Sequence, residues 1–159
     1  MEVDRRTLLV GAVVASAPVE QGSRIAPRLL GAWTFLDGAT INAGGRETPW
    51  TASRHLDGGL LIFAPGGYFS LQLAALPAYV AATPELPGFA ERWFGCFGKF
   101  AVDEDRRELS MEIVGSYVFS ELSSNRPRKI ELAGNVLAIT KPPPPSGELR
   151  SNRLRWTRT

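Results

Sequence analysis

The chain has 159 residues, of which 44% are hydrophobic and 21% are charged; this length and composition indicate one folded domain with a core and exclude a disordered chain. The formal net charge of +2 is too small to indicate a nucleic-acid partner by itself. Cys96 is the single cysteine, which excludes an internal disulfide and a multi-cysteine zinc site. The sequence contains no run of about 20 apolar residues, the length that spans a bilayer.

Residues 1–22 have the features of an export signal. Arg5 and Arg6 precede an apolar stretch, Thr7–Ala17, which ends in the A-x-A cleavage pattern. The paired arginines predict a signal peptide of the twin-arginine type, and therefore a periplasmic or secreted protein. The alternative is an N-terminal helix or strand that packs on the domain of a cytoplasmic protein. The domain itself is assigned to residues 28–159.

The first half of the domain reads as strands separated by turns. A polar linker over Gly22–Leu30 leads into a first strand at Leu29–Phe35. Asp37–Arg54 is rich in Gly, Asn, Thr and Pro, and we expect mostly loop there, with room for one short edge strand. Gly58–Leu73 holds two strand-like runs around a Pro-Gly-Gly turn, which predicts a β-hairpin. Gly88–Phe94 could form one or two helical turns.

The second half is also β in pattern. Strands are predicted at Phe97–Val102, at Leu109–Val114 with a bulge near Gly115, at Arg128–Leu132, at Val136–Thr140 and at Arg153–Thr157. The result is about eight or nine short strands joined mostly to their neighbours, with one short helix. A meandering antiparallel sheet of this size usually closes into an up-and-down barrel, because closure removes the unpaired edges.

Several stretches resemble a known family. Gly31-Ala32-Trp33 is similar to the G-x-W signature of lipocalins, and more specifically the chain resembles the bacterial and fungal lipocalin-like domain family. The matching stretches are Leu30–Trp33, Gly59–Phe63 with Gly67–Ser70, Phe97–Asp103, Arg128–Leu137 and Leu154–Arg158. They occur in the family's order and cover most of Leu29–Arg158.

This resemblance implies a lipocalin-like barrel that is open at one end. In lipocalins the tryptophan of the first strand packs across the closed end, and a basic side chain from the last strand covers it. Trp33 matches the tryptophan, and Arg155 or Arg158 matches the basic residue. Their contact would be a cation–π interaction with a structural role.

An eight-stranded barrel is about wide enough to hold one small ligand. Aromatic walls and a few polar contacts are the usual composition of such a pocket. The candidate ligand-binding residues are Phe69, Ser70, Gln72, Phe97, Glu112, Tyr117, Arg128 and Trp156. Strand parity alone does not decide which of them face the interior, so the alternative for each is the solvent-facing side or a filled core.

Catalytic and metal-binding patterns are weak. Glu112 could act as a general acid or base if it is buried, and Arg128 could bind a carboxylate; the alternative is that both take part in exposed cross-strand ion pairs. His55 stands alone without a nucleophile-elbow pattern, and Cys96 has aromatic neighbours and no nearby base. We therefore expect no metal and no cofactor, and leave any catalytic residue unassigned.

The sequence favours non-covalent binding of a small apolar molecule inside the barrel, as a carrier or sensor. A second hypothesis is a cyclase or isomerase that folds a reactive chain in its pocket and needs no metal. A third is a filled structural barrel without a ligand. A nucleic-acid partner and an integral membrane segment in the mature chain are not expected, and the oligomeric state stays open.

Overall fold

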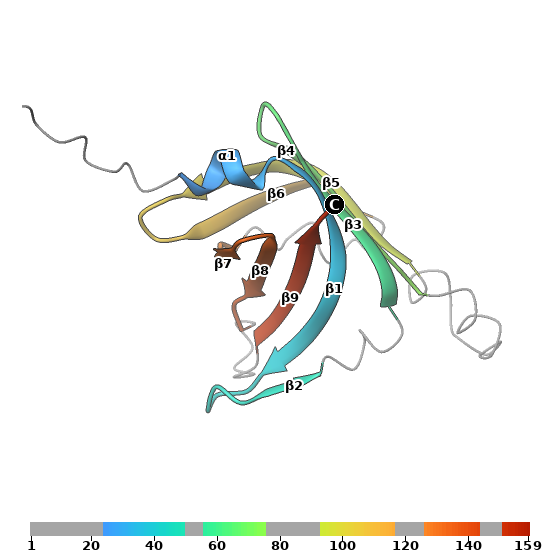
Figure 1. Ribbon diagram of the computed structural model, residues 1–159, viewed down its shortest axis with the longest axis vertical. Coiled ribbons are helices and arrows are strands. Elements are labelled where there is room, and N and C mark those ends of the chain that lie inside the picture. The colour runs from blue at the N-terminus through green and yellow to red at the C-terminus, as the bar shows by residue number, and fades with distance from the viewer. Residues whose placement is uncertain (1–23, 50–55, 76–92, 117–125, 144–150) are drawn as a thin grey trace, which may run out of the picture.

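The computed structural model describes residues 24–49, 56–75, 93–116, 126–143 and 151–159. The predicted signal segment, residues 1–22, lies outside these ranges. The described residues form a strongly curved antiparallel sheet with one short helix beside it (Figure 1).

The described strands form a single nine-stranded sheet that closes on itself. The elements are α1 (Ile25–Leu29), β1 (Gly31–Ile41), β2 (Glu47–Pro49), β3 (Leu56–Ala64), β4 (Tyr68–Ala75), β5 (Trp93–Asp103), β6 (Glu108–Ser116), β7 (Arg128–Ala133), β8 (Val136–Lys141) and β9 (Ser151–Arg158). The order is β2-β1-β3-β4-β5-β6-β7-β8-β9, and β1 also pairs with β9. Eight strands therefore make a closed antiparallel barrel, and β2 is an additional strand on the far end of β1. The predicted fold class, an all-β up-and-down barrel with one short helix, is confirmed.

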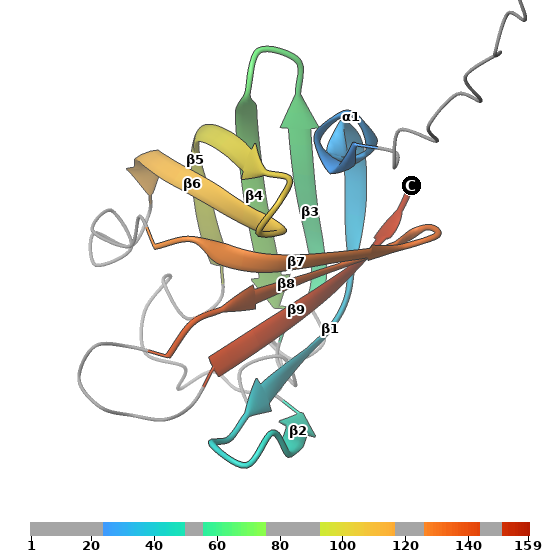
Figure 2. The ribbon, with the colours of Figure 1, turned by 90° about the vertical axis from the view of Figure 1, so that its left-hand side faces the viewer.

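The barrel is joined more loosely at one seam than elsewhere. The described pairing of β6 with β7 consists of two positions, Glu108 with Lys129 and Leu109 with Arg128. The other neighbouring strands of the barrel pair over four or more positions. Beyond the two shared positions β6 and β7 diverge (Figure 2).

Alternating side chains build the core. In β6, Leu109, Met111 and Ile113 are buried, whereas Ser110 and Glu112 are exposed, because successive side chains of a strand point to opposite faces. The strand predicted at Leu109–Val114 is confirmed as part of β6. The largest fully buried side chains among the described residues are Trp33, Trp156, Phe63, Leu29, Leu61, Leu109, Ile130 and Leu137.

The N-terminal end of the domain differs from the prediction. Residues 25–29 form the helix α1 where we expected a linker, and the first strand begins at Gly31 and not at Leu29. Pro27 is tolerated because it lies in the first turn, where its missing N–H has no helical partner to lose. α1 has five residues, and no helix within the described ranges is long and apolar enough to cross a bilayer.

β1 and β5 extend furthest beyond the predicted strands, because pairing with distant strands overrides local sequence preference. β1 continues to Ile41 through a segment that we expected to be loop, and its residues from Asp37 onward pair with β9. β5 begins at Trp93, which pairs with Ala74, so the helical turns predicted over Gly88–Phe94 are wrong for its last two residues. Residues 88–92 lie outside the described ranges.

The bulge predicted near Gly115 is confirmed. Phe97 pairs with Gly115 and Gly98 pairs with Ile113, so Val114 is the extra residue in β6. Gly98 is required at this point, because a Cβ on it would lie 1.9 Å from the carbonyl oxygen of Glu112.

Candidate functional site

One end of the barrel is covered by α1, and the N-terminus of that helix is fixed by a distant carboxylate. The backbone N–H groups of Ile25 and Ala26 donate to the two carboxylate oxygens of Glu104, at 2.8 and 2.9 Å. Glu104 lies in the turn between β5 and β6. It satisfies two N–H groups that have no partner inside the helix, so the turn and the helix are held together.

The C-terminus of α1 is fixed by β1 and β9. The indole N–H of Trp33 donates to the carbonyl of Leu29 at 2.8 Å. The guanidinium of Arg158 donates to the carbonyl of Leu30 at 3.0 Å and also to that of Arg28. Its central carbon lies 4.4 Å from the centre of the Trp33 ring. These two side chains thus donate hydrogen bonds to three carbonyls at the end of the helix, and they stack on each other.

Arg155, the other predicted partner of Trp33, is used differently. It lies on the outer face of β9, exposed, and makes a two-point contact with the carboxylate of Asp37 on β1. The hydrogen bonds to Asp37 raise the pKa of Arg155 above its ordinary value. Arg158 and not Arg155 therefore makes the contact with Trp33.

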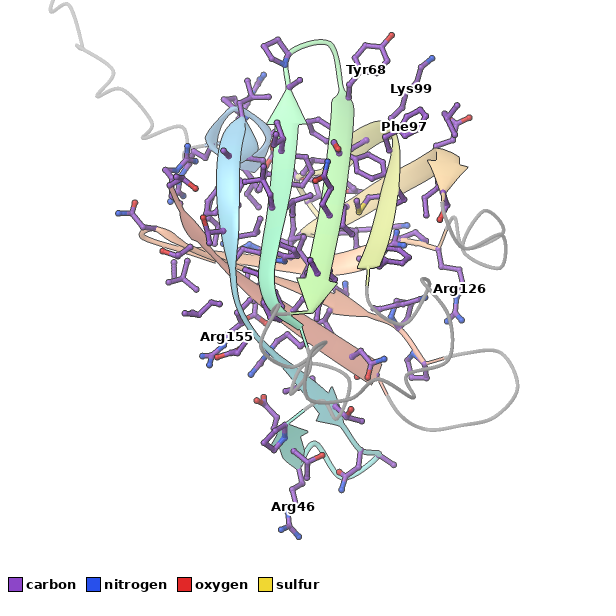
Figure 3. All side chains as sticks on the ribbon, turned by 90° about the vertical axis from the view of Figure 1, so that its right-hand side faces the viewer. Arg46, Tyr68, Phe97, Lys99, Arg126 and Arg155 are labelled. Atoms are coloured by element: carbon purple, nitrogen blue, oxygen red, sulfur yellow. The ribbon has the colours of Figure 1, made fainter. Side chains whose placement is uncertain are left out.

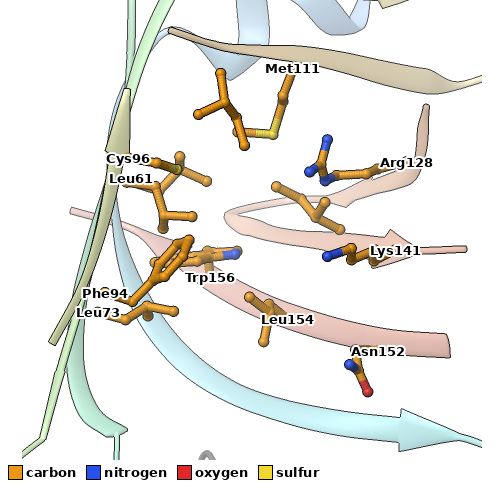
Figure 4. Close-up of a pocket in the computed structure, with 13 residues that line it drawn as sticks. Leu61, Leu73, Phe94, Cys96, Met111, Arg128, Lys141, Asn152, Leu154 and Trp156 are labelled. Atoms are coloured by element: carbon orange, nitrogen blue, oxygen red, sulfur yellow. The ribbon is translucent and has the colours of Figure 1, made fainter. Parts of the chain in front are cut away.

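A cavity of about 300 Å³ lies inside the barrel (Figure 4), and none of its described lining residues belongs to α1. Its described lining comes from every barrel strand except β1: Leu61, Leu71, Leu73, Phe94, Cys96, Met111, Ile113, Arg128, Ile139, Lys141, Asn152, Leu154 and Trp156. Ten of these thirteen residues are apolar, and the three polar residues all come from β7, β8 and β9. The cavity is therefore apolar on most sides and polar on one.

Strand register explains this division. Lys141 pairs with Asn152, and Ile139 pairs with Leu154, so each step of two residues along β8 and β9 gives one inward-facing layer. Arg128 falls in the same layer as Lys141, because Lys129 pairs with Thr140 next to it. Lys141 and Asn152 lie at the ends of their strands, and Trp156 lies two layers further toward the closed end. The layer that contains Arg128, Lys141 and Asn152 is consequently the outermost layer of the described lining.

The polar groups of the cavity are mainly hydrogen-bond donors. The oxygen of the Asn152 side chain accepts from the hydroxyl of Thr40 at 3.2 Å. Arg128 is the buried charged residue of the described ranges, 8% exposed, and one of its guanidinium nitrogens donates to the carbonyl of Arg126 at 3.4 Å. The indole nitrogen of Trp156 is fully buried, and no hydrogen-bond acceptor within the described residues reaches it.

Two of the predicted ligand-binding residues, Arg128 and Trp156, line the cavity. Phe69 is buried inside the barrel but is not part of the described lining. Tyr117 lies outside the described residues. The other four point away from the interior, namely Ser70, Gln72, Phe97 and Glu112.

Period-two alternation is the reason for these outward positions. Phe69, Leu71 and Leu73 face inward on β4, so Ser70 and Gln72 must face outward. Ser70 and Gln72 join Phe97 in a shallow depression on the outer surface. Phe97 is 57% exposed (Figure 3), with its ring 2.5 Å from where a Cβ on Gly115 would be. The ring thus occupies the space that Gly115 leaves open.

The other candidates of the sequence do not form a reactive cluster. His55 lies outside the described residues, and Cys96 is buried in the cavity wall. Within the described ranges no group of three or more His, Cys, Asp and Glu side chains could hold a metal ion.

Sequence reasoning missed Lys141 and Asn152. Two other basic residues of the C-terminal segment, Arg153 and Arg155, face outward and pair with carboxylates, whereas Lys141 lines the cavity. The period-two alternation of the two strands identifies both residues. Lys141 follows Ile139 by two, and Asn152 precedes Leu154 by two, so each shares the inner face of its strand.

Comparison with known proteins gives little further information. No protein-family model matches the chain, and no curated protein matches it significantly. Among solved structures it is similar to the crystal structure of a DUF4847 family protein from Bacteroides vulgatus ATCC 8482. The identity is 11%, the match covers 82% of this chain and 94% of that chain, and the TM-score is 0.46. We draw neither a family nor a function from a likeness of this extent.

Proposed function

We propose that this protein binds one small, largely apolar molecule inside its barrel, as a carrier or sensor. The observation that carries the proposal is the cavity of about 300 Å³ with ten apolar residues among its thirteen described lining residues. Ligand pockets have this composition, an apolar lining with a few placed polar groups, and this volume is at the lower end of their range.

The position of the cavity supports the same proposal. Its described lining lies on paired strands, which hold side chains more rigidly than loops do. The opposite end of the barrel is covered by α1, whose two ends are fixed by Glu104, Trp33 and Arg158. A pre-formed cavity on such a fixed framework suits a small ligand.

We also propose a lipocalin-like relationship for this barrel, and export of the chain. The contact between Trp33 and Arg158 supports the relationship, because it is the arrangement that the G-x-W resemblance implies. The arginine pair and apolar stretch of residues 1–22 support export.

The first test is native mass spectrometry of the full chain purified from its own source, compared with the denatured mass. An excess of a few hundred daltons in the native mass would indicate a carried ligand and begin its identification. The denatured mass also shows whether residues up to Ala17 have been removed. An unmodified N-terminus would contradict export.

A second test uses the neutral fluorescent probe N-phenyl-1-naphthylamine. Leu154→Trp should fill the cavity and weaken probe binding by about tenfold or more, because a packed interior leaves no room for extra atoms. Leu60→Trp places the same side chain on the outer face of β3 and should leave binding unchanged. Absence of probe binding to the parent protein, or equal binding to both variants, would refute an interior site.

A further inference from the structure

We infer that the ligand carries an anionic oxygen group, such as a carboxylate, at the Arg128–Lys141 side of the cavity and an apolar body on the opposite side. The inference rests on the proposed function and specifies the chemical class of its ligand. Figure 4 shows the side chains of Arg128 and Lys141 extending into the cavity from one side, with the indole nitrogen of Trp156 on the ring edge turned toward them.

The polar groups at this side share one chemical property. Guanidinium, ammonium and indole N–H groups can only donate hydrogen bonds. Asn152 uses its oxygen to accept from Thr40, which leaves its NH₂ group as a further donor. A ligand group that fits this set must accept hydrogen bonds, and two cations favour an acceptor with negative charge.

The indole of Trp156 provides the independent observation. Trp156 is 1% exposed, and its N–H has no acceptor among the described residues. A buried donor without a partner costs about 1–3 kcal/mol, and buried polar groups in folded proteins are nearly always satisfied. Trp33, the other fully buried tryptophan of the barrel, is satisfied by the carbonyl of Leu29. An acceptor on the ligand would satisfy Trp156 in the same way.

The opposite side of the cavity suits a hydrocarbon body. Leu61 pairs with Leu71, and Leu71 pairs with Cys96, so a continuous apolar row crosses β3, β4 and β5. A guanidinium carries five N–H donors, so Arg128 can hold its contact with Arg126 and an oxygen of the ligand together. The inference therefore requires no loss of the contact between Arg128 and the carbonyl of Arg126.

The test compares three ligands that share a ten-carbon chain and differ in the head: decanoate, decanol and decylammonium. Each is added as a competitor of N-phenyl-1-naphthylamine to the full-length protein, below the micelle concentration of the two charged ligands and below the solubility limit of decanol. Decanoate should bind about tenfold more tightly than decanol, because charge-assisted hydrogen bonds are roughly twice as strong as neutral ones. Decylammonium should bind most weakly.

Two variants and one control locate the effect. Arg128→Gln and Lys141→Gln should each reduce the preference for decanoate over decanol severalfold. Lys129→Gln removes a neighbouring cation that lies outside and pairs with Glu108, and should change neither affinity. Lys141 is only half-buried, so its variant gives an answer even if Arg128→Gln fails to fold.

The indole N–H gives a direct readout. In ¹⁵N-tryptophan-labelled protein, decanoate should shift the Nε1–H signal of Trp156, which Trp156→Phe identifies by its disappearance. Equal affinity for decanoate and decanol, or a preference that survives in Arg128→Gln and Lys141→Gln alike, would overturn the anionic head and leave the interior site intact. Failure of the neutral probe and all three ligands to bind would instead refute the proposed function itself.

Discussion

Arg158 stacks on Trp33 with its guanidinium carbon 4.4 Å from the ring centre, and the two residues are direct partners across β1 and β9. This contact lies where the barrel closes on itself. It also fixes α1, because both side chains bind carbonyls at the C-terminus of that helix. One pair of residues therefore couples barrel closure to the covering of one end.

Removal of Arg158 tests this coupling. Arg158→Ala should lower the free energy of unfolding by about 1–3 kcal/mol, because it removes the cation–π contact and the charge-assisted hydrogen bonds to two carbonyls. Arg155→Ala on the same strand should cost less than about 1 kcal/mol, since an exposed ion pair contributes little. Urea unfolding of both variants measures the difference, and equal losses would contradict the special role of Arg158.

Glu104 should control the other end of α1. Glu104→Ala removes the acceptor for the N–H groups of Ile25 and Ala26 and should destabilise the helix by about 0.5–2 kcal/mol, as loss of an N-terminal cap does. Hydrogen exchange should be faster at those two amides than in the parent protein. Asp105→Ala, an exposed substitution in the same turn, is the control and should leave their exchange unchanged.

Gly31 is the first residue of β1 and lies two residues after the end of α1. Its φ is +120°, and a Cβ would lie 3.3 Å from a guanidinium nitrogen of Arg158. Gly31→Ala should therefore cost about 1–3 kcal/mol through backbone strain alone. Gly58 is a strand glycine with open space around it and no such φ, so Gly58→Ala should be close to neutral in the same thermal-unfolding measurement.

Because of the Asp37–Arg155 pair, we expect the free energy of unfolding to depend little on pH near neutrality. The hydrogen bonds to Asp37 raise the pKa of Arg155, so the stability linked to that proton is complete below the ordinary arginine pKa and is lost only as the pH rises through the higher folded-state value. Asp37→Asn should cost less than about 1 kcal/mol, and equally at pH 6 and pH 9. A cost that disappears between these values would contradict this linkage.

The barrel could be predicted because alternation is a local signal. Leu109, Met111 and Ile113 identify their inner face without any knowledge of the neighbouring strands. The helix α1 could not be predicted in this way. Its five residues are stabilised by Glu104 and Arg158, which lie far away in the sequence, and an isolated helix of that length is not stable in water.

The candidate site was predicted only in part, for a related reason. A strand presents one face to the interior, and the predicted residues Phe69 and Ser70 are neighbours that cannot share a face. Arg128 and Lys141 point inward despite their charge because they lie at the outer layer of the cavity. Charge alone suggests solvent for such residues, and the parity set by Ile130 and Ile139 is the signal that identifies them.

Substitution of the two fully buried tryptophans should change the free energy of unfolding by different amounts, which can be measured without any ligand. Trp33 is 0% exposed and donates to the carbonyl of Leu29, whereas Trp156 is 1% exposed and has no acceptor among the described residues. Each change to Phe removes a similar volume. Trp33→Phe also loses a hydrogen bond and leaves the carbonyl of Leu29 without this donor. Trp156→Phe, in contrast, removes a donor that was unsatisfied.

Trp33→Phe should therefore lower the free energy of unfolding by about 1–3 kcal/mol more than Trp156→Phe does in ligand-free protein. Saturation of the parent protein with decanoate should raise its stability by mass action, and this gain should be smaller in Trp156→Phe because the indole donor is missing. Chemical unfolding of the three proteins with and without decanoate measures both effects. Equal costs for the two substitutions without ligand would show that Trp156 finds an acceptor in the free protein.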